Sequence, residues 1–74
     1  MSEVFVWNFK FWSSDSEEWE EVSYFSSEDN QQLLTEHLIR EEEGKAEDIS
    51  LVKQVITWDE FSSMGYGKEM LIQS

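Results

Sequence analysis

Hydrophobic and polar residues alternate along residues 3–12, EVFVWNFKFW, with the period of two that is typical of a β-strand. The aromatic residues of one face are Phe5, Trp7, Phe9 and Phe11. The other face is apolar at both ends, and a strand with two apolar faces is usually central in its sheet or covers a partner surface. Residues 13–18 predict a turn and residues 19–25, WEEVSYF, predict a second strand, so the two strands form an antiparallel hairpin.

Residues 26–43 have the apolar spacing of an amphipathic helix. The stripe that can pack against the sheet is formed by Leu34 and Leu38. We expect Ser26 or Ser27 to be the N-cap of this helix, because a serine side chain can accept a hydrogen bond from the first turn. Gly44 is expected to follow the last helical residue in the left-handed conformation that glycine adopts freely.

Residues 49–58, ISLVKQVITW, are rich in β-branched residues and predict a third strand. Asp59 is expected to cap a short helical turn, and residues 68–73 predict either a fourth short strand or a terminal helix. The order β-β-α-β with a short C-terminal element predicts one small α+β domain over residues 1–74. In it, a small antiparallel or mixed sheet carries one helix on one face. The residues expected to be buried are Phe5, Trp7, Phe9, Leu34, Leu38, Val55 and Ile56.

The composition narrows the kind of partner that the chain can bind. Its 74 residues carry 17 Asp+Glu and 5 Lys+Arg, a formal net charge of -12. Direct binding to nucleic acid or to an anionic membrane is therefore not expected, because both require a basic face. An aromatic content of 15% is too high for a disordered acidic tail, and the absence of cysteine excludes disulfides. The sequence shows no signal peptide and no long apolar run, so we expect a cytoplasmic protein.

The residues that could carry chemistry do not indicate an enzyme. The single histidine, His37, has no G-x-S-x-G elbow to supply a nucleophile. The glycines lack the spacing of dinucleotide-binding and P-loop motifs. The carboxylates do not match a calcium loop, and neighbouring carboxylates on a helix point in different directions. We therefore expect no catalytic residue, no metal and no cofactor.

The distribution of the acidic residues is more informative than their number. Residues 13–29 contain acids and no base. On the expected helix, Asp29, Glu36 and Glu43 are seven residues apart, which is about two turns and places them on one line about 10 Å apart. Arg40 is expected to pair with Glu36 on that line. Two interpretations remain open, which are a solvated face that favours solubility and a contact surface for a basic partner.

The energetics of the expected helix favour the second interpretation, because the acids of residues 41–43 fall in the last turn, where the helix dipole disfavours anions. The four tryptophans either form the core or leave one or two as exposed anchors, since each buries on the order of 200 Å² and a core this small cannot easily hide them all. Trp12, beside the acidic turn, is the best candidate for an exposed anchor, followed by Trp58 and Tyr66. The expected contact residues are Asp15, Glu17, Glu18, Glu20, Glu21, Asp29, Glu36, Glu43 and Trp12.

In size, charge and aromatic content the whole chain resembles the small, acidic, cysteine-free proteins of bacteriophages that mimic DNA and inhibit host enzymes. The resemblance involves no sequence motif and assigns no residues. It implies a non-enzymatic inhibitor that occupies the basic groove of a nucleic-acid-binding enzyme. The alternative is a structural or assembly subunit that self-associates through its aromatic first strand, and the sequence leaves open whether the protein is a monomer or a homodimer.

Overall fold

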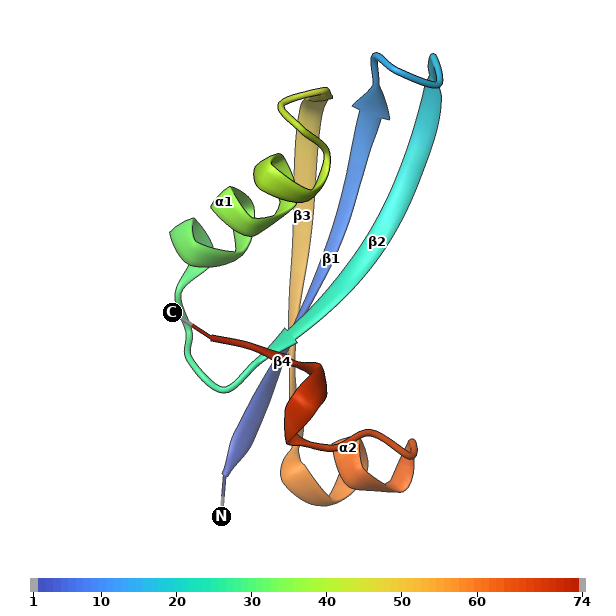
Figure 1. Cartoon of the computed structure of the whole chain (residues 1–74). Helices are drawn as coiled ribbons and strands as arrows, with labels where there is room; N and C mark the ends of the chain where they lie inside the picture. Colours follow the sequence, from blue (N-terminus) through green and yellow to red (C-terminus); the bar gives the residue numbers. More distant parts are fainter. Residues whose placement is uncertain (1, 74) are drawn as a thin grey trace.

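Four strands and two α-helices make up the part of the chain that the computed structural model describes, residues 2–73. The strands are β1 (Glu3–Ser13), β2 (Glu18–Ser26), β3 (Ala46–Thr57) and β4 (Leu71–Ile72). The helices are α1 (Gln31–Glu41), α2 (Trp58–Ser63) and the 3-10 helix η1 (Lys68–Met70). The predicted α+β class is confirmed, and the C-terminal element is η1 followed by β4 (Figure 1). Within residues 2–73, none of the helices has the length and apolar character that crossing a bilayer requires.

The mixed sheet has the strand order β3-β1-β2-β4, so β1 lies inside it. β1 is antiparallel to both β2 and β3, whereas β2 and β4 are parallel. The central position agrees with the apolar character of both faces of β1. It also means that both backbone edges of β1 are already paired within the chain. A second copy could therefore not pair with β1 without displacing β2 or β3.

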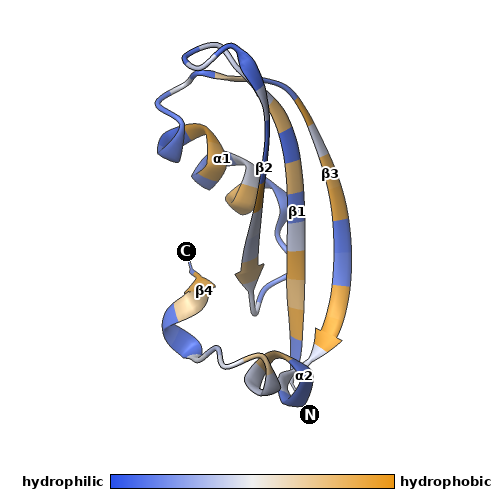
Figure 2. Ribbon diagram, turned by 90° about the vertical axis from the view of Figure 1, so that its right-hand side faces the viewer, coloured by the Kyte–Doolittle hydropathy of each residue, from blue (hydrophilic) through white to orange (hydrophobic). Residues whose placement is uncertain are grey.

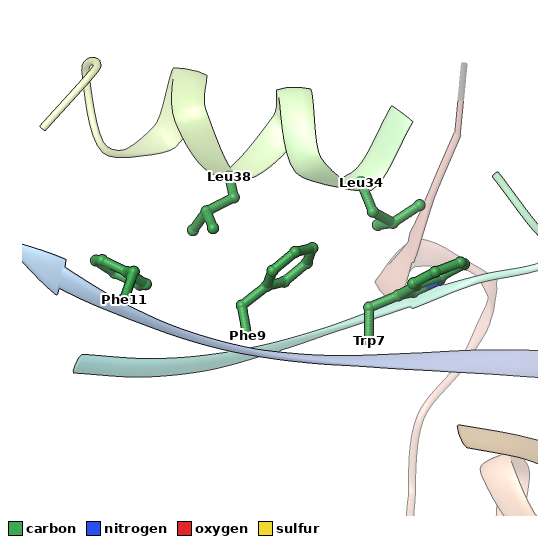
Figure 3. Close-up of a cluster of buried hydrophobic side chains, with 5 residues drawn as sticks. All are labelled: Trp7, Phe9, Phe11, Leu34 and Leu38. Atoms are coloured by element: carbon green, nitrogen blue, oxygen red, sulfur yellow. The ribbon is translucent and has the colours of Figure 1, made fainter. Parts of the chain in front are cut away.

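One face of the sheet, here called the α1 face, is covered by α1. Leu34 and Leu38 point from α1 toward the β1 aromatic residues (Figure 3). All five side chains of this cluster are at most 2% exposed. The cluster consists of Trp7, Phe9, Phe11, Leu34 and Leu38. The four-residue spacing of the leucines and the two-residue spacing of the aromatic residues thus converge on one core, as the sequence predicts.

The opposite face, here called the α2 face, is covered only near the N-terminal end of β1. Val4 and Val6 of β1 are buried there, and Phe61 of α2 is fully buried. The ring of Phe61 lies 5.1 Å from that of Phe25, which pairs with Val6 across the sheet. This second cluster was not expected from the sequence, because the short helix carries a single buried residue, Phe61, and so shows no periodic pattern. It leaves the other half of the α2 face bare.

The expected ends of the helices are wrong in three places. The N-cap of α1 is Asn30, whose side chain accepts a hydrogen bond from the N–H of Leu33, and not Ser26 or Ser27. The N-cap of α2 is Thr57, not Asp59, since Thr57 and Glu60 form a capping box. α1 also ends at Glu41, two residues before the expected end, although Gly44 is left-handed as expected, with a φ of 75°.

The expected core is confirmed for four of its seven members, the two leucines together with Trp7 and Phe9. Phe5 and Ile56 are only half-buried, and Val55 is wrong because it is 49% exposed. Val55 lies on β3 at the edge of the sheet, beyond the area that α1 covers. An apolar strand residue is buried only where a second layer covers it, and the sequence pattern does not show where that layer ends.

Ser26 has a structural role that explains why it does not cap the helix. It ends β2, is fully buried, and its Oγ accepts a hydrogen bond of 2.7 Å from Nε1 of Trp7. The same hydroxyl donates to the carbonyl of Glu28. Replacing Ser26 by alanine leaves the buried indole N–H without an acceptor, so we expect the free energy of unfolding to fall by about 1–3 kcal/mol.

Chemical denaturation of the Ser26→Ala variant measures this loss. Ser23→Ala is the matched control, because Ser23 is exposed and donates its hydrogen bond to the half-buried Asn8. The control should stay within about 0.5 kcal/mol of the wild type. Equal stabilities for the two serine variants would contradict the role of the Trp7–Ser26 hydrogen bond.

Candidate functional site: an acidic end

Two segments that are far apart in the sequence meet at one end of the molecule. The turn between β1 and β2 and the loop between α1 and β3 lie side by side there (Figure 1). The backbone N–H of Ser14 donates to the carbonyl of Lys45 at 2.9 Å, and the two strand ends are joined by the pairing of Ser13 with Ala46. Since β1 pairs with both β2 and β3, the two acidic segments are held at the same end by the sheet itself.

We call the carboxylates of these segments the acidic end. Its members are Asp15, Glu17, Glu18, Glu42, Glu43, Glu47 and Asp48. The only basic residue of the two segments is Lys45, whose Nζ lies 3.4 Å from Oδ1 of Asp15. Six carboxylates of the acidic end thus have no basic partner among residues 2–73. Figure 2 shows the ribbon of this end as mostly hydrophilic.

Three members of the acidic end have a left-handed backbone. Glu17, Glu43 and Asp48 have φ values of 57°, 53° and 51°, and they are the only residues besides glycine with positive φ in the described chain. Glu43 occupies the position after the α1 C-cap, where glycine is usual, and its N–H bonds the carbonyl of Arg40. Asp48 is the extra residue of a bulge in β3 opposite Phe11. A glutamate at such a position costs about 1 kcal/mol relative to glycine, whereas aspartate is among the residues that tolerate it.

The structure separates the other two acids of the predicted hairpin group. Glu20 and Glu21 follow each other on β2, so their side chains lie on opposite faces of the sheet. Glu20 is half-buried on the α1 face and accepts a hydrogen bond from Ser16, whereas Glu21 lies on the α2 face opposite Lys10. Of these two, Glu21 is the exposed one that borders the bare part of the sheet.

The predicted acidic line on the helix does not form. Asp29 precedes α1 and Glu43 follows it, so only Glu36 belongs to the helix. Asp29 is bound by Lys53 of β3, whose Nζ lies 3.0 Å from both carboxylate oxygens. Among residues 2–73 the expected ion pair between Arg40 and Glu36 is not formed either. Glu43 therefore joins the acidic end, while Asp29 and Glu36 lie apart from it.

Trp12 and Trp19 form an edge-to-face pair beside the acidic end, with ring centroids 5.6 Å apart. They face each other across β1 and β2 on the bare half of the α2 face. Trp12 is half-buried, but Trp19 is 53% exposed and so is the more accessible tryptophan. The ammonium group of Lys10 lies 5.6 Å from the Trp19 ring centroid, which shows that this ring already holds a cation.

The single histidine, His37, lies on α1 beside Glu41 and Tyr24. Nε2 of His37 lies 3.5 Å from Oε1 of Glu41, and its ring packs edge-on against Tyr24 at 4.8 Å. No group of three or more potential metal ligands converges within these residues. An open groove of about 390 Å³ crosses the bare half of the α2 face, lined among others by Asn8, Lys10 and Val52.

Tyr24 is a group whose titration responds to its burial and to the acids at the C-terminal end of α1. Partial burial raises the pKa of its phenol, and the nearby charges of Glu41 and Glu42 raise this pKa further. A raised folded-state pKa means that the fold favours the neutral phenol. Its contribution to stability is complete below the unfolded pKa of about 10 and is lost as pH rises through the folded pKa.

We therefore expect the melting temperature of the wild type to fall more steeply above pH 10 than that of Tyr24→Phe, because phenylalanine has no proton to lose. Tyr66→Phe is the control, since the ring of Tyr66 packs against Phe25 and Phe61, away from Glu41 and Glu42. Thermal melts followed by circular dichroism from neutral to alkaline pH measure the difference. Parallel curves for Tyr24→Phe and wild type would contradict the raised pKa.

The sequence pattern missed part of the acidic end and the more exposed tryptophan. Glu42, Glu47, Asp48 and Trp19 were not among the predicted contact residues. The signal that could have found them is the antiparallel pairing of β1 with β3, which places Glu47 opposite Trp12. Comparison of the chain with protein-family models, curated proteins and solved structures gives no match.

Proposed function

We propose that the protein is a non-enzymatic binding protein whose acidic end engages a basic surface of another protein. One observation carries the proposal, which is that two separate acidic segments are brought together at one end with a single lysine between them. Carboxylates at this density repel one another and lower the stability of the isolated fold. A basic partner would relieve that repulsion when it binds.

The backbone of the acidic end supports this proposal. Glu17 and Glu43 hold carboxylates at left-handed positions, where glycine or asparagine would be more stable. For Glu43 the dipole of α1 adds a second cost, because the negative end of the helix is next to it. Charges that serve only to keep the protein in solution could lie at any exposed site, without either cost.

The pair of Trp12 and Trp19 supplies an anchor next to these charges. Tryptophan residues are frequent among the contacts that contribute most to protein–protein affinity. Long-range attraction from the acidic end would accelerate association, and contact with the exposed Trp19 would slow dissociation. An arginine of the partner could bind the Trp19 ring only by displacing the ammonium group of Lys10, so the attraction for a basic partner comes from the acidic end.

In its specific form, the proposal is that the protein occupies the nucleic-acid groove of an enzyme as a DNA mimic and inhibits it. A duplex carries one charge per about 1.7 Å of its axis, so a mimic needs carboxylates at high density. The acidic end supplies this density locally, because its seven carboxylates lie at one end with a single lysine between them.

Capture of partners from a bacterial lysate at low and at high salt tests the proposal. We expect basic, nucleic-acid-binding proteins to be retained at low salt and released at high salt, because screening weakens charge-driven association. Duplex DNA added as a competitor should displace the same proteins if they are bound through their nucleic-acid grooves. If no basic protein is retained at low salt, the proposal is contradicted. If duplex DNA does not displace the retained proteins, only the DNA-mimic form of the proposal is contradicted.

A further inference from the structure

The two edges of the sheet differ in how they are protected. β4 covers the end of β2 at Phe25 and Ser26, and the uncovered part of β2 carries Glu18, Glu20 and Glu21. At the other edge, β3 pairs with β1 on one side and with no strand of residues 2–73 on its other side. Figure 2 shows β3 as the outermost strand at that edge. A long strand with unpaired backbone groups is a template for pairing with another strand.

The part of β3 that follows Asp48 carries no negative charge. Between Asp48 and Asp59 the chain has no acidic residue, and Lys53 is the only charged residue. Five consecutive or nearly consecutive side chains are exposed there. They are Ser50, Val52, Lys53, Gln54 and Val55. In a protein with a net charge of -12, this edge is the place where a second acidic chain can approach with least repulsion.

We propose that β3 is a homodimer interface in which two copies pair antiparallel, with Val52 opposite Val52 of the second copy. The two sheets then form one continuous sheet around a two-fold axis perpendicular to it. Val52 is 63% exposed in the single chain, the largest exposure among the exposed large hydrophobic residues of residues 2–73. Burying it against its own copy gives this exposed residue an apolar partner.

In this register residues two and three positions from Val52 meet residues of similar polarity, while Leu51 would face Lys53 of the second copy. Ile49 lies three residues before Val52 and Val55 three residues after it, so Ile49 of one copy would face Val55 of the second copy. Ser50 and Gln54 are two residues before and after it, so polar side chains would also face each other. Directly opposed residues of an antiparallel pair lie on the same face, so α1 of both copies would cover the same side.

The neighbouring symmetric registers are less favourable. A shift of one residue toward the C-terminus centres the pairing on Lys53, and like charges directly opposite each other destabilise a sheet. A shift of one residue toward the N-terminus centres it on Leu51 and places Val55 opposite Glu47. The bulge at Asp48 interrupts the regular backbone at the start of β3. Pairing with a second copy is therefore confined to the residues of β3 that follow it.

The salt dependence of this dimer is opposite to that of the proposed binding to a basic partner. Two chains of net charge -12 repel each other at long range, and salt screens this repulsion. The dimer should therefore become stronger as salt is added, whereas binding to a basic surface should become weaker. The two proposals can fail independently, because β3 shares no residue with the acids expected to contact the partner except Glu47 and Asp48 at its start.

Because the chain contains no cysteine, a single Val52→Cys replacement introduces a unique thiol. Opposed residues have Cβ atoms about 4.5–5.5 Å apart, so mild oxidation or a short thiol-reactive linker should join two Val52→Cys chains. Val55→Cys is the matched control, as Val55 is also exposed on β3. In the proposed register the two copies of Val55 are separated by about 20 Å, six residues along the strands, and should not be joined.

The mass of the wild-type protein in solution, measured over a range of concentrations at low and high salt, tests the dimer without a crosslink. We expect a dimer whose affinity rises with salt and falls at least about tenfold in Val52→Glu, because two carboxylates then oppose each other. Met64→Glu, which changes an exposed residue away from β3, should leave the affinity within about twofold. Thermal melts check that both variants fold.

Three results would overturn the proposal. A wild-type protein that stays monomeric at every concentration and salt would exclude the dimer. A dimer that joins through Val55→Cys and not through Val52→Cys would exclude the register. A monomer that loses capture of a basic partner when Val52 is replaced by glutamate would assign the edge of β3 to that partner instead of a second copy.

Discussion

The Leu38→Ala variant is expected to lose about 2–5 kcal/mol of unfolding free energy, because the removed atoms leave a cavity between α1 and the sheet. Leu38 is fully buried and faces the aromatic residues of β1 (Figure 3). A domain of 74 residues has a total stability of roughly 4–11 kcal/mol at typical values per residue. The loss is a large fraction of this stability, and the melting temperature should fall by about 8–40 °C.

Ile39→Ala is the control for this variant. Ile39 follows Leu38 on α1 but is 40% exposed, so its truncation removes less buried surface and leaves no enclosed cavity. Chemical denaturation of both variants, followed by tryptophan fluorescence, compares the two free energies of unfolding. Similar small losses in Leu38→Ala and Ile39→Ala would mean that α1 does not pack on the sheet through the stripe of Leu34 and Leu38.

The elements of this fold that are long and periodic can be predicted from the sequence. The period-two aromatic pattern of β1 and the four-residue spacing of the α1 leucines both report burial, and burial decided the outcome at these sites. Ser26 shows where such reasoning fails. Its local sequence predicts an N-cap, but its side chain accepts a buried hydrogen bond from Trp7 instead. A contact between residues 19 positions apart leaves no local signal.

The candidate site was less predictable than the fold for the same reason. Asp15, Glu17, Glu18 and Trp12 were assigned from their local density, and the structure places them together at one end. The line through Asp29, Glu36 and Glu43 failed because α1 is shorter than its apolar pattern suggests. Four of the seven members of the acidic end come from residues 42–48, and only the pairing of β1 with β3 brings them beside the hairpin turn.

The two uncovered surfaces of the sheet lead to different expectations about partners. The bare half of the α2 face borders the acidic end and carries the exposed Trp19, and the charges of the acidic end favour a basic partner. The edge of β3 is nearly free of charge and exposes Val52, which favours a second copy. In the proposed dimer the two acidic ends would point in opposite directions, because the strands that join the copies are antiparallel. Each copy would keep its acidic end free for a partner.

Reversing four charges of the acidic end is expected to abolish binding to the basic partner while leaving the fold intact. The variant replaces Glu17, Glu18, Glu43 and Glu47 by lysine, all of them exposed. Like charges across an interface cost several kcal/mol, so binding should weaken by at least about a thousandfold. Surface replacements usually change stability by less than about 0.5 kcal/mol each, and relief of repulsion at this end acts in the stabilising direction.

The control must separate the position of the charges from their number. Lysine at Glu3, Glu28, Glu36 and Glu69 changes the net charge by the same amount, from -12 to -4, at exposed sites outside the acidic end. If the acidic end is the contact surface, the control should bind with a smaller loss that salt reduces, because only long-range attraction is weakened. Affinity for one captured partner, measured at two salt concentrations for wild type and both variants, decides between them. Equal losses of affinity in the two variants would show that net charge alone drives binding. Unchanged affinity in the variant of the acidic end would show that the acidic end does not contact the partner.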